Sequence, residues 1–226
     1  AVSTATGDRI VEVPLWQMNR LWDETNAQKD GTIWRETAFR SADQMILQGP
    51  LFHVGNPLYK TPRTACNSNK AYDVIDLVAA PDDYLPRTNY GPAMEMGDYR
   101  RRMTQCRWDP TKTHPDFYRV AVRKMLALNG ERTLIGALIP PGVTHVDSVQ
   151  SISFSDQAHL LNFNALVSSL PADALLKVTG QQNLHDNILA GFPWPICGST
   201  AESRALRLAS LTSEFSDLWN RHASTL

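Results

Sequence analysis

Basic side chains are concentrated in the middle third of the sequence. Between Arg87 and Arg132 there are ten basic and five acidic residues, a local balance of +5 in a chain whose net charge is −1. A face of this sign attracts polyanions, and long cationic side chains contact nucleic-acid phosphates. We therefore predict a DNA-binding face. Its predicted residues are Lys60, Arg63, Arg87, Arg100, Arg101, Arg102, Arg107, Arg119, Arg123, Lys124 and Arg132.

The same residues allow a second interpretation. Aromatic residues such as Trp108 and Tyr118 lie among the cations, which suits a nucleic-acid surface. A solvated helix or loop face with scattered ion pairs would carry the same residue types, and exposed ion pairs contribute little to stability. The spacing of the basic residues leaves both interpretations open.

A second group with possible chemistry is Asn56-Pro57-Leu58-Tyr59. It comes close to the Asn-Pro-Pro-Tyr loop of adenine methyltransferases, where the Asn side chain and a Pro carbonyl bind the target amino group and the aromatic ring stacks on the flipped base. Here Leu58 stands in place of the second Pro. Residues 1–54 contain no Gly-rich turn for a methyl donor and are too short for half of a doubly wound sheet. Catalysis by Asn56 and Tyr59 is therefore the weaker hypothesis.

Other catalytic signatures are absent or incomplete. Pro81-Asp82 and Pro115-Asp116 could begin a magnesium-dependent nuclease motif, but no Glu-X-Lys follows at a useful distance. The sequence has no Gly-X-Ser-X-Gly and no Walker-type phosphate loop. The six His residues are scattered, and we predict no metal site.

The composition indicates a cytoplasmic protein with one hydrophobic core. Apolar residues make up 42% of the 226 residues, and no apolar run approaches the length of a membrane span. Cys66, Cys106 and Cys197 are few and far apart, so we expect reduced thiols rather than a disulfide framework. The chain shows no signal peptide, and the lack of an initiator Met suggests a processed chain or a piece of a longer one.

The elements that must position these groups include both strands and helices. Two segments read as strands, 133–139 as a continuous apolar run and 149–154 by its alternation. Helical spacing is predicted for 116–127 and 156–170, and 31–48 is expected to be partly helical. The segments 54–64 and 72–78 read as a strand or loop, and 81–90 and 180–198 as loops. We predict an α+β fold with a mixed sheet and packed helices.

A C-terminal helix should complete the core. Ser199 and Glu202 form a capping-box pattern, and apolar residues from Ala201 to Trp219 repeat at intervals of three and four. The apolar stripe most simply packs on the core, and a partner surface is the alternative.

Several segments together resemble a known family. The stretch 49–63 is followed by Tyr72-Asp-Val-Ile-Asp-Leu77, by 83–90 and by Tyr118-Arg-Val-Ala-Val-Arg123. The most specific segment is Glu131-Arg-Thr-Leu-Ile-Gly-Ala-Leu-Ile-Pro-Pro-Gly142, although Gly136 stands where Ala is usual; the segments 206–208 and 217–219 complete the set. Over roughly residues 40–226 the chain resembles the C-terminal, TaqI-like specificity region of bacterial adenine-specific DNA methyltransferases, including type II restriction–modification and phage-defence enzymes.

The resemblance implies a single target-recognition domain over residues 1–226, with residues 1–40 a possible linker from a preceding methyltransferase domain. That missing domain would bind S-adenosylmethionine, so no cofactor is expected in this chain. Double-stranded DNA and the methyltransferase domain are the implied partners. Base-reading positions vary with the target sequence in such families, so the resemblance transfers none.

Three hypotheses follow. The first is a sequence-specific DNA-recognition module whose parent enzyme performs the chemistry. The second is a minimal adenine methyltransferase that uses Asn56 and Tyr59. The third is a protein-docking module of a phage-defence complex, with residues 201–226 as the contact.

Overall fold

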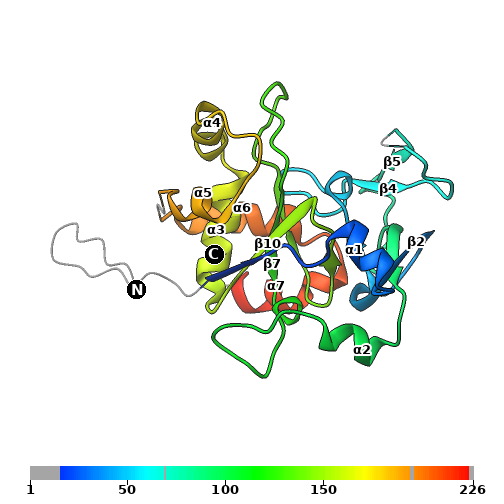
Figure 1. The fold of residues 1–226 in the computed structure, drawn as a ribbon. Helices are drawn as coiled ribbons and strands as arrows, with labels where there is room; N and C mark the ends of the chain where they lie inside the picture. The colour runs from blue at the N-terminus through cyan, green and yellow to red at the C-terminus, as the bar shows by residue number, and fades with distance from the viewer. Residues whose placement is uncertain (1–15, 69, 194–195, 224–226) are drawn as a thin grey trace.

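The computed structural model describes residues 16–68, 70–193 and 196–223. Helices and strands are interspersed along the chain (Figure 1), which confirms the predicted α+β class. The strands are β1 (Trp16–Asn19), β2 (Ile33–Ala38), β3 (Ile46–Leu47), β4 (Lys60–Pro62), β5 (Tyr72–Val74), β6 (Thr88–Pro92), β7 (Arg119–Arg123), β8 (Gly136–Ile139), β9 (Thr144–His145) and β10 (Val149–Phe154). The α-helices are α1 (Glu24–Lys29), α2 (Met96–Arg101), α3 (Gln157–Ser168), α4 (Leu170–Val178), α5 (Asp186–Ala190), α6 (Ser199–Ala209) and α7 (Ser216–His222). Short 3-10 turns include η2 (Gly49–Leu51) and η4 (Ser213–Phe215).

An antiparallel sheet in the order β1-β10-β7-β8 forms the centre of the molecule. Every residue of β8 and β10 is buried, and β7 is buried from Arg119 to Val122. The sheet is therefore covered on both faces, which explains why the segment that forms β8 is a continuous apolar run. The predicted strands 133–139 and 149–154 correspond to β8 and β10.

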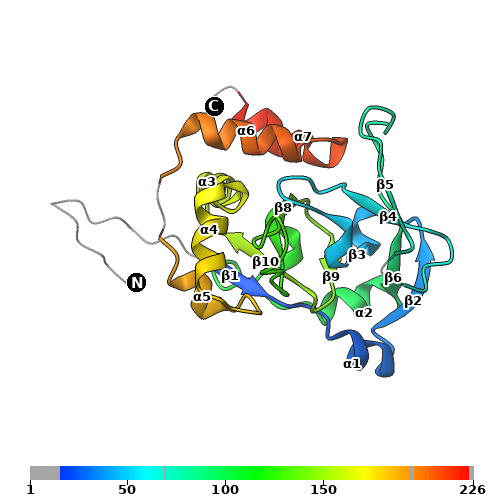
Figure 2. The same ribbon diagram turned by 90° about the horizontal axis from the view of Figure 1, so that it is seen from above.

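Helices cover one face of this sheet. Side chains of β7, β8 and β10 form a core with α3, α4, α6 and α7, and Figure 2 shows these helices together on one side. Asp156 caps α3 by accepting from the Ala158 amide, and Ser169 caps α4 by accepting from the Ala172 amide. The predicted helix at 156–170 is α3.

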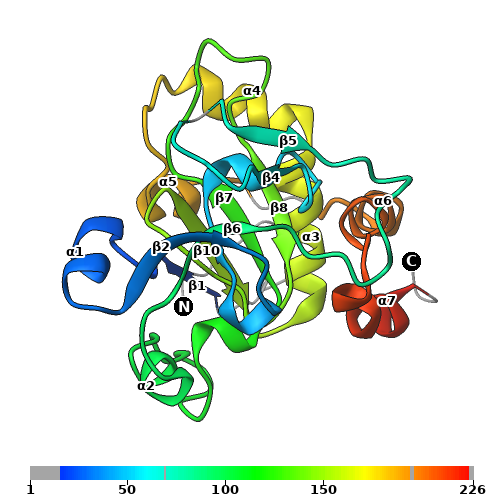
Figure 3. The same ribbon diagram turned by 90° about the vertical axis from the view of Figure 1, so that its right-hand side faces the viewer.

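Short strands and turns cover the opposite face. Met45, Leu51 and Phe52 pack there against Ala137 and Ile139 of β8. A further cluster around Trp22, Tyr90 and Tyr99 joins the antiparallel pair β2–β6 to α1 and α2. Figure 3 shows the β4–β5 pair at one end of this layer and α2 at the other.

Several local predictions were wrong. Residues 119–123 form a strand instead of a helix, because burial on both faces hides the strand alternation. The expected helix in 31–48 is instead β2, a 3-10 turn and β3. Residues 186–190 of the predicted loop form α5, and 88–92 form β6. The C-terminal helix breaks after Ala209 into α6 and α7, and Ser199 begins α6 without capping it.

The described part of residues 1–40 belongs to the fold instead of forming a linker. Strand β1 pairs with β10 along the edge of the central sheet, and Trp22 is buried against Tyr99. The indole of Trp22 donates a hydrogen bond of 2.7 Å to the Tyr99 hydroxyl. Residues 1–15 lie outside the described part of the chain.

Gly136 has a packing role between the central sheet and α3. It begins β8 under α3, and a Cβ there would lie 2.6 Å from Val167 Cγ1 and 2.9 Å from Val122 Cγ1. Real Cβ atoms do not approach other carbons so closely, so the sheet and α3 can pack at this distance only with glycine at 136.

Candidate nucleic-acid interface

The predicted basic stretch does not form one surface. Its residues lie on separate elements: Arg87 precedes β6, Arg100 and Arg101 end α2, and Arg119 and Arg123 are on β7. Figures 1 and 3 place α2 away from the β4–β5 pair, at the other end of the β2–β6 layer. The local excess of positive charge in the sequence is therefore divided among several places.

The three arginines at the end of α2 are exposed but individually paired. Arg100 lies 3.3 Å from Asp43, and Arg102 lies 3.2 Å from Asp30. Arg101 pairs with Asp98 one turn earlier on the same helix. Each pair reduces the attraction that the arginine alone would offer a phosphate, which fits the alternative interpretation of a solvated face for this part of the stretch. Arg107 is exposed on the following loop.

Arg119 is a correction to the predicted DNA-binding set. Its side chain has 0% exposure, so it has no surface to offer a phosphate. The guanidinium donates to the backbone carbonyls of Phe117, Pro140 and Val143. Burial lowers the pKa of Arg119 to about 9, so the side chain is still charged at neutral pH and ties the loop after β8 to β7.

Arg119 also joins a buried chain of histidine and serine side chains. Ser151 Oγ lies 2.7 Å from His145 Nε2 and 2.9 Å from His114 Nε2, and Ser153 Oγ lies 2.8 Å from His114 Nδ1. His114, His145, Ser151 and Ser153 are all 0% exposed. This grouping of serine and histidine is therefore internal and has no route to a substrate.

The shorter hydrogen bonds among these histidine and serine side chains are satisfied by one tautomer of each imidazole ring. His145 Nδ1 faces the carbonyl of Val146, which can only accept, so Nδ1 carries the proton and Nε2 accepts from Ser151. His114 Nε2 then donates to Ser151, and His114 Nδ1 accepts from Ser153, whose hydroxyl lies closer to this nitrogen, at 2.8 Å, than to the Gln17 carbonyl, at 3.5 Å. Burial, with the nearby Arg119 as the second cause, lowers the pKa of His145 to about 3 and that of His114 well below its ordinary value.

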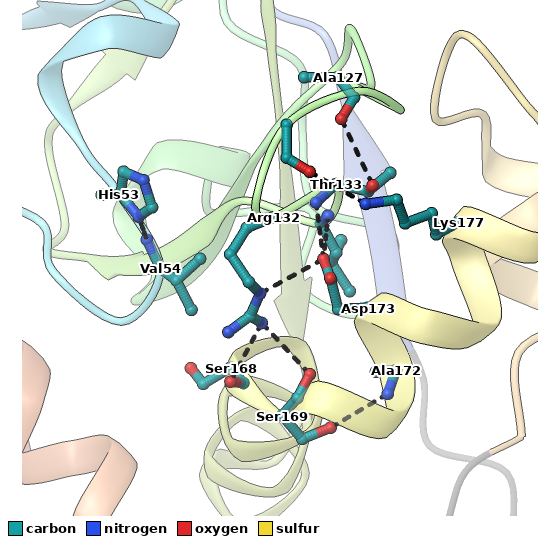
Figure 4. Close-up of polar contacts among 12 residues, drawn as sticks. His53, Val54, Ala127, Arg132, Thr133, Ser168, Ser169, Ala172, Asp173 and Lys177 are labelled. Carbon is teal, nitrogen blue, oxygen red and sulfur yellow. Dashed lines mark hydrogen bonds and ion pairs between the residues drawn. The ribbon is translucent and has the colours of Figure 1, made fainter.

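Arg132 and Lys124 are a further correction, because both are engaged in internal ion pairs. Arg132 Nε lies 3.4 Å from Asp173 of α4, with side chains only 16% and 8% exposed. Figure 4 shows the Arg132 guanidinium donating to the Ser168 and Ser169 carbonyls, while Asp173 accepts from the Thr133 and Leu134 amides. Lys124 pairs at 2.5 Å with Asp147. These cations hold the β7–β8 connection (residues 124–135) in place.

The remaining predicted cations gather near β4. Arg87 Nε donates to the Pro62 carbonyl at 2.8 Å, and its guanidinium lies over the exposed Phe39 ring. Arg63 pairs with Asp73 at 2.8 Å across β4 and β5, and both side chains are at least half exposed. Lys60 lies 4.8 Å from the Tyr59 ring centroid. Lys60 lies on β4, Arg63 follows it and Arg87 contacts its last residue, so these three cations lie on or beside β4, apart from the rest of the predicted set.

Asn56 and Tyr59 have local structural roles. Asn56 Oδ1 accepts a hydrogen bond of 2.9 Å from the Leu58 amide, so the side chain closes its own turn. The Tyr59 ring packs edge-on against His53. This loop lies against α6, where Gly55 meets Leu208. A methyltransferase needs a free amide oxygen and a free aromatic face, and this geometry favours neither.

A cleft of about 500 Å³ lies between the β4–β5 connection (residues 63–71) and the β7–β8 connection. Its lining includes Arg35 of β2, Gln48 before η2, Asn67 and Ser68 of the β4–β5 connection, and Arg123 of β7. Figures 1 and 3 show the two connections extending from the body of the molecule on either side of η2. We call this feature the polar cleft.

Arg35 is the most available cation of the polar cleft. It is exposed, and one Nη donates to the Cys66 carbonyl at 3.1 Å. Within the described ranges no carboxylate lies within ion-pairing distance of it. Arg123 donates through Nε and Nη2 to the Gly49 and Phe52 carbonyls, so it both holds η2 and lines the cleft.

The floor of the polar cleft is an ordered amide–phenol network. Asn89 Nδ2 donates to Gln48 Oε1 and to the Tyr72 hydroxyl, each at 2.8 Å, and Asn89 Oδ1 accepts from Thr37. The oxygen of Gln48 is thereby fixed, and no residue in the described part of the chain accepts from its amide nitrogen. Burial, with the neighbouring Cys66 thiol second, raises the pKa of Tyr72 to about 12, so its hydroxyl stays neutral.

The charge balance of the polar cleft is positive. Glu24 is its acidic lining residue, against Arg35 and Arg123. The Tyr90 hydroxyl donates to Glu24, and burial, followed by this hydrogen bond, raises the pKa of Tyr90. With the amide nitrogen of Gln48, the two arginines give the cleft several hydrogen-bond donors, which suit a ligand rich in acceptor oxygens such as a phosphate.

Sequence reasoning found only Arg123 among these lining residues. Arg35, Gln48 and Asn89 lie outside the basic stretch or carry no charge, and their elements are brought together only by the β2–β6 pairing and by η2. A usable signal was the sequence Trp34-Arg35 in a short strand, an exposed aromatic beside a cation.

In the described ranges no group of three His, Cys, Asp or Glu side chains is placed to hold a metal ion, and the three cysteines are free thiols. Within the same ranges, no helix has both the length and the apolar character needed to cross a membrane. No protein-family model matches the sequence, and no curated protein or solved structure matches it either.

Proposed function

We propose that this chain is a DNA target-recognition unit and that its polar cleft receives the sugar–phosphate ridge of one strand of a duplex. The observation that carries the proposal is the donor-rich cleft with the unpaired Arg35 and the constrained Arg123. The sugar–phosphate backbone is the convex part of a duplex, so a concave cationic site fits it better than it fits the concave grooves.

The two connections beside the cleft would then face the grooves on either side of the strand. The β4–β5 connection supplies exposed Arg63, Asn67 and Ser68, which are residue types that contact phosphates or base edges. The β7–β8 connection is held by the Arg132–Asp173 and Lys124–Asp147 pairs. Rigid support of the β7–β8 connection reduces the entropy lost on binding.

The resemblance to specificity regions of adenine-specific DNA methyltransferases supports the same proposal from the sequence. In that arrangement, S-adenosylmethionine and methyl transfer belong to another domain of the parent enzyme. The local roles of Asn56 and Tyr59 agree with this division, because neither side chain is free for a flipped base.

The test is the salt dependence of duplex binding, measured by fluorescence anisotropy with a labelled duplex. Each phosphate contact contributes about 0.9 to the slope of log K against log salt concentration. We expect Arg35→Gln to weaken binding and to reduce the slope by about one. Arg204→Gln, at an exposed position of α6 on the other face of the central sheet, is the matched control and should change neither.

The α2 arginines provide a second comparison. Arg100, Arg101 and Arg102 are each paired with an aspartate, so replacing all three with Ala should reduce the slope by less per residue than Arg35→Gln does. If the slope of log K against log salt concentration is the same for Arg35→Gln as for the unmodified protein, the cleft does not contact the DNA backbone. Absence of duplex binding by the unmodified protein would refute the proposed function itself.

A further inference from the structure

Met125 stands at the rim of the polar cleft with its side chain exposed. The residue is 74% exposed and lines the cleft together with Arg123. Arg123 is the last residue of β7, Met125 follows it by two positions, and both line the cleft. An apolar side chain therefore lies beside the groups that would bind the DNA backbone.

The backbone at Met125 is held firmly. Met125 forms a bridge with Asn183, in which the Leu126 amide donates to Gln182 at 2.9 Å and the Leu184 amide donates to Lys124 at 2.8 Å. The Lys124 amide donates to the Ser148 carbonyl, and the Leu126 side chain is buried in the core. The exposed thioether thus extends from a fixed base, whereas an exposed side chain on a free loop could fold back onto the protein.

Exposure alone would mean little, because isolated apolar residues are common on protein surfaces. Val178 at the end of α4 is 86% exposed and has no cationic cleft beside it. What distinguishes Met125 is the combination of a fixed backbone, the cleft and the neighbouring cation Arg123. Apolar side chains in such positions insert between base steps and unstack them in proteins that bend DNA.

We propose that Met125 is a wedge that enters the base stack next to the strand seated in the polar cleft, so that this protein bends its target. The inference rests on the proposed function and adds a class of preferred substrate. Pyrimidine–purine steps unstack most easily, so the target should carry a TA or CA step at the place where Met125 enters. Specificity at that step would come from its deformability, without hydrogen bonds to its bases.

The experiment begins with selection of bound duplexes from a pool with a randomised centre. The selected duplex is then labelled at both ends, and bending is measured by energy transfer for the unmodified protein and three variants. We expect selection of a flexible step and a bend on binding. Met125→Ala should abolish the bend and reduce the preference for that step from on the order of ten-fold to none. Met125→Leu, which keeps an apolar wedge, and Val178→Ala should retain both.

The outcomes separate the two proposals. If the unmodified protein binds duplex with the expected salt slope but leaves it straight, or if Met125→Ala bends it equally well, the wedge is refuted and the cleft proposal stands. If the unmodified protein does not bind any duplex in the pool, the proposed function is refuted and the wedge with it. Loss of the bend in Met125→Ala with an unchanged salt slope supports both.

Discussion

Acidification should destabilise this protein through its buried histidines. His114 and His145 are 0% exposed, and their hydrogen-bond chain through Ser151 and Ser153 fits the neutral form of both rings. A proton on His145 Nε2 would face the Ser151 hydroxyl that now donates to it, while Nδ1 already donates to Val146. The folded protein therefore excludes protons that the unfolded chain accepts.

The size of the stability loss follows from the difference between the pKa of His145 in the unfolded chain and its pKa in the folded protein. Above the unfolded value of about 6.5, both states are neutral and stability is at its full value. Below about pH 6.5 the imidazole of the unfolded chain is protonated, whereas that of the folded protein stays neutral. This difference persists until the pH reaches the folded pKa of His145, which burial lowers to about 3. Between pH 7.5 and about pH 5, proton uptake by His145 in the unfolded chain therefore lowers the free energy of unfolding by about 2 kcal/mol, at 1.36 kcal/mol per pH unit below about 6.5. His114, whose pKa burial also lowers, adds a loss of the same sign.

The assay is urea unfolding followed by tryptophan fluorescence at several pH values. The free energy of unfolding should fall by at least about 1.4 kcal/mol per pH unit below pH 6, since His145 takes up one proton on unfolding and His114 adds to the uptake. His145→Gln should remove the His145 part of this slope, although it lowers stability at neutral pH. His159→Gln is the control, because that side chain is 40% exposed on α3.

Nitrogen NMR of the imidazole rings measures the tautomers of the two buried histidines independently. We expect the Nδ1–H tautomer for His145 and the Nε2–H tautomer for His114 at neutral pH. A stability that is flat between pH 7.5 and pH 5, or two rings that titrate near pH 6.5 in the folded protein, would refute this reasoning.

Three further changes test the packing that supports the polar cleft, each by urea unfolding at neutral pH. Gly136→Ala should destabilise the protein by about 2 kcal/mol, because the new methyl group meets Val167 and Val122; an unchanged midpoint would show that α3 can move away. Gln150→Met should stabilise it by about 1 kcal/mol, because the Gln150 amide is buried without a protein partner; a loss of stability would indicate a hydrogen-bonded water there. Asp173→Ala should cost about 3 kcal/mol by leaving the Arg132 charge and two β7–β8 amides unpaired, and an effect below about 1 kcal/mol would contradict the structural role of this pair.

The sequence predicted best where one strong local pattern decides the structure. The apolar run at 133–139, the alternation at 149–154 and the helical spacing at 156–170 correspond to β8, β10 and α3. It failed for β7, because a strand covered on both faces shows no alternation of buried and exposed residues. The short strands β3 and β4 carry too few residues for any period to be read, and the burial of β2 does not alternate regularly.

The candidate site was less predictable than the fold. A count of basic residues cannot distinguish Arg119, which is buried under backbone carbonyls, from Arg35, which is exposed at the cleft. The difference depends on which loops pack over each residue, and that is decided by contacts between distant segments. Gln48 and Asn89, 41 positions apart, meet through a side-chain hydrogen bond that no local pattern indicates.

The most direct test of the central proposal is phosphate-ethylation interference on a duplex bound by the unmodified protein. If the polar cleft holds one sugar–phosphate ridge, ethylation should block binding at a short run of adjacent phosphates on one strand. Ethylation of some of these phosphates should no longer weaken binding by the Arg35→Gln variant. Interference spread evenly along both strands, or a pattern unchanged by Arg35→Gln, would contradict the proposal.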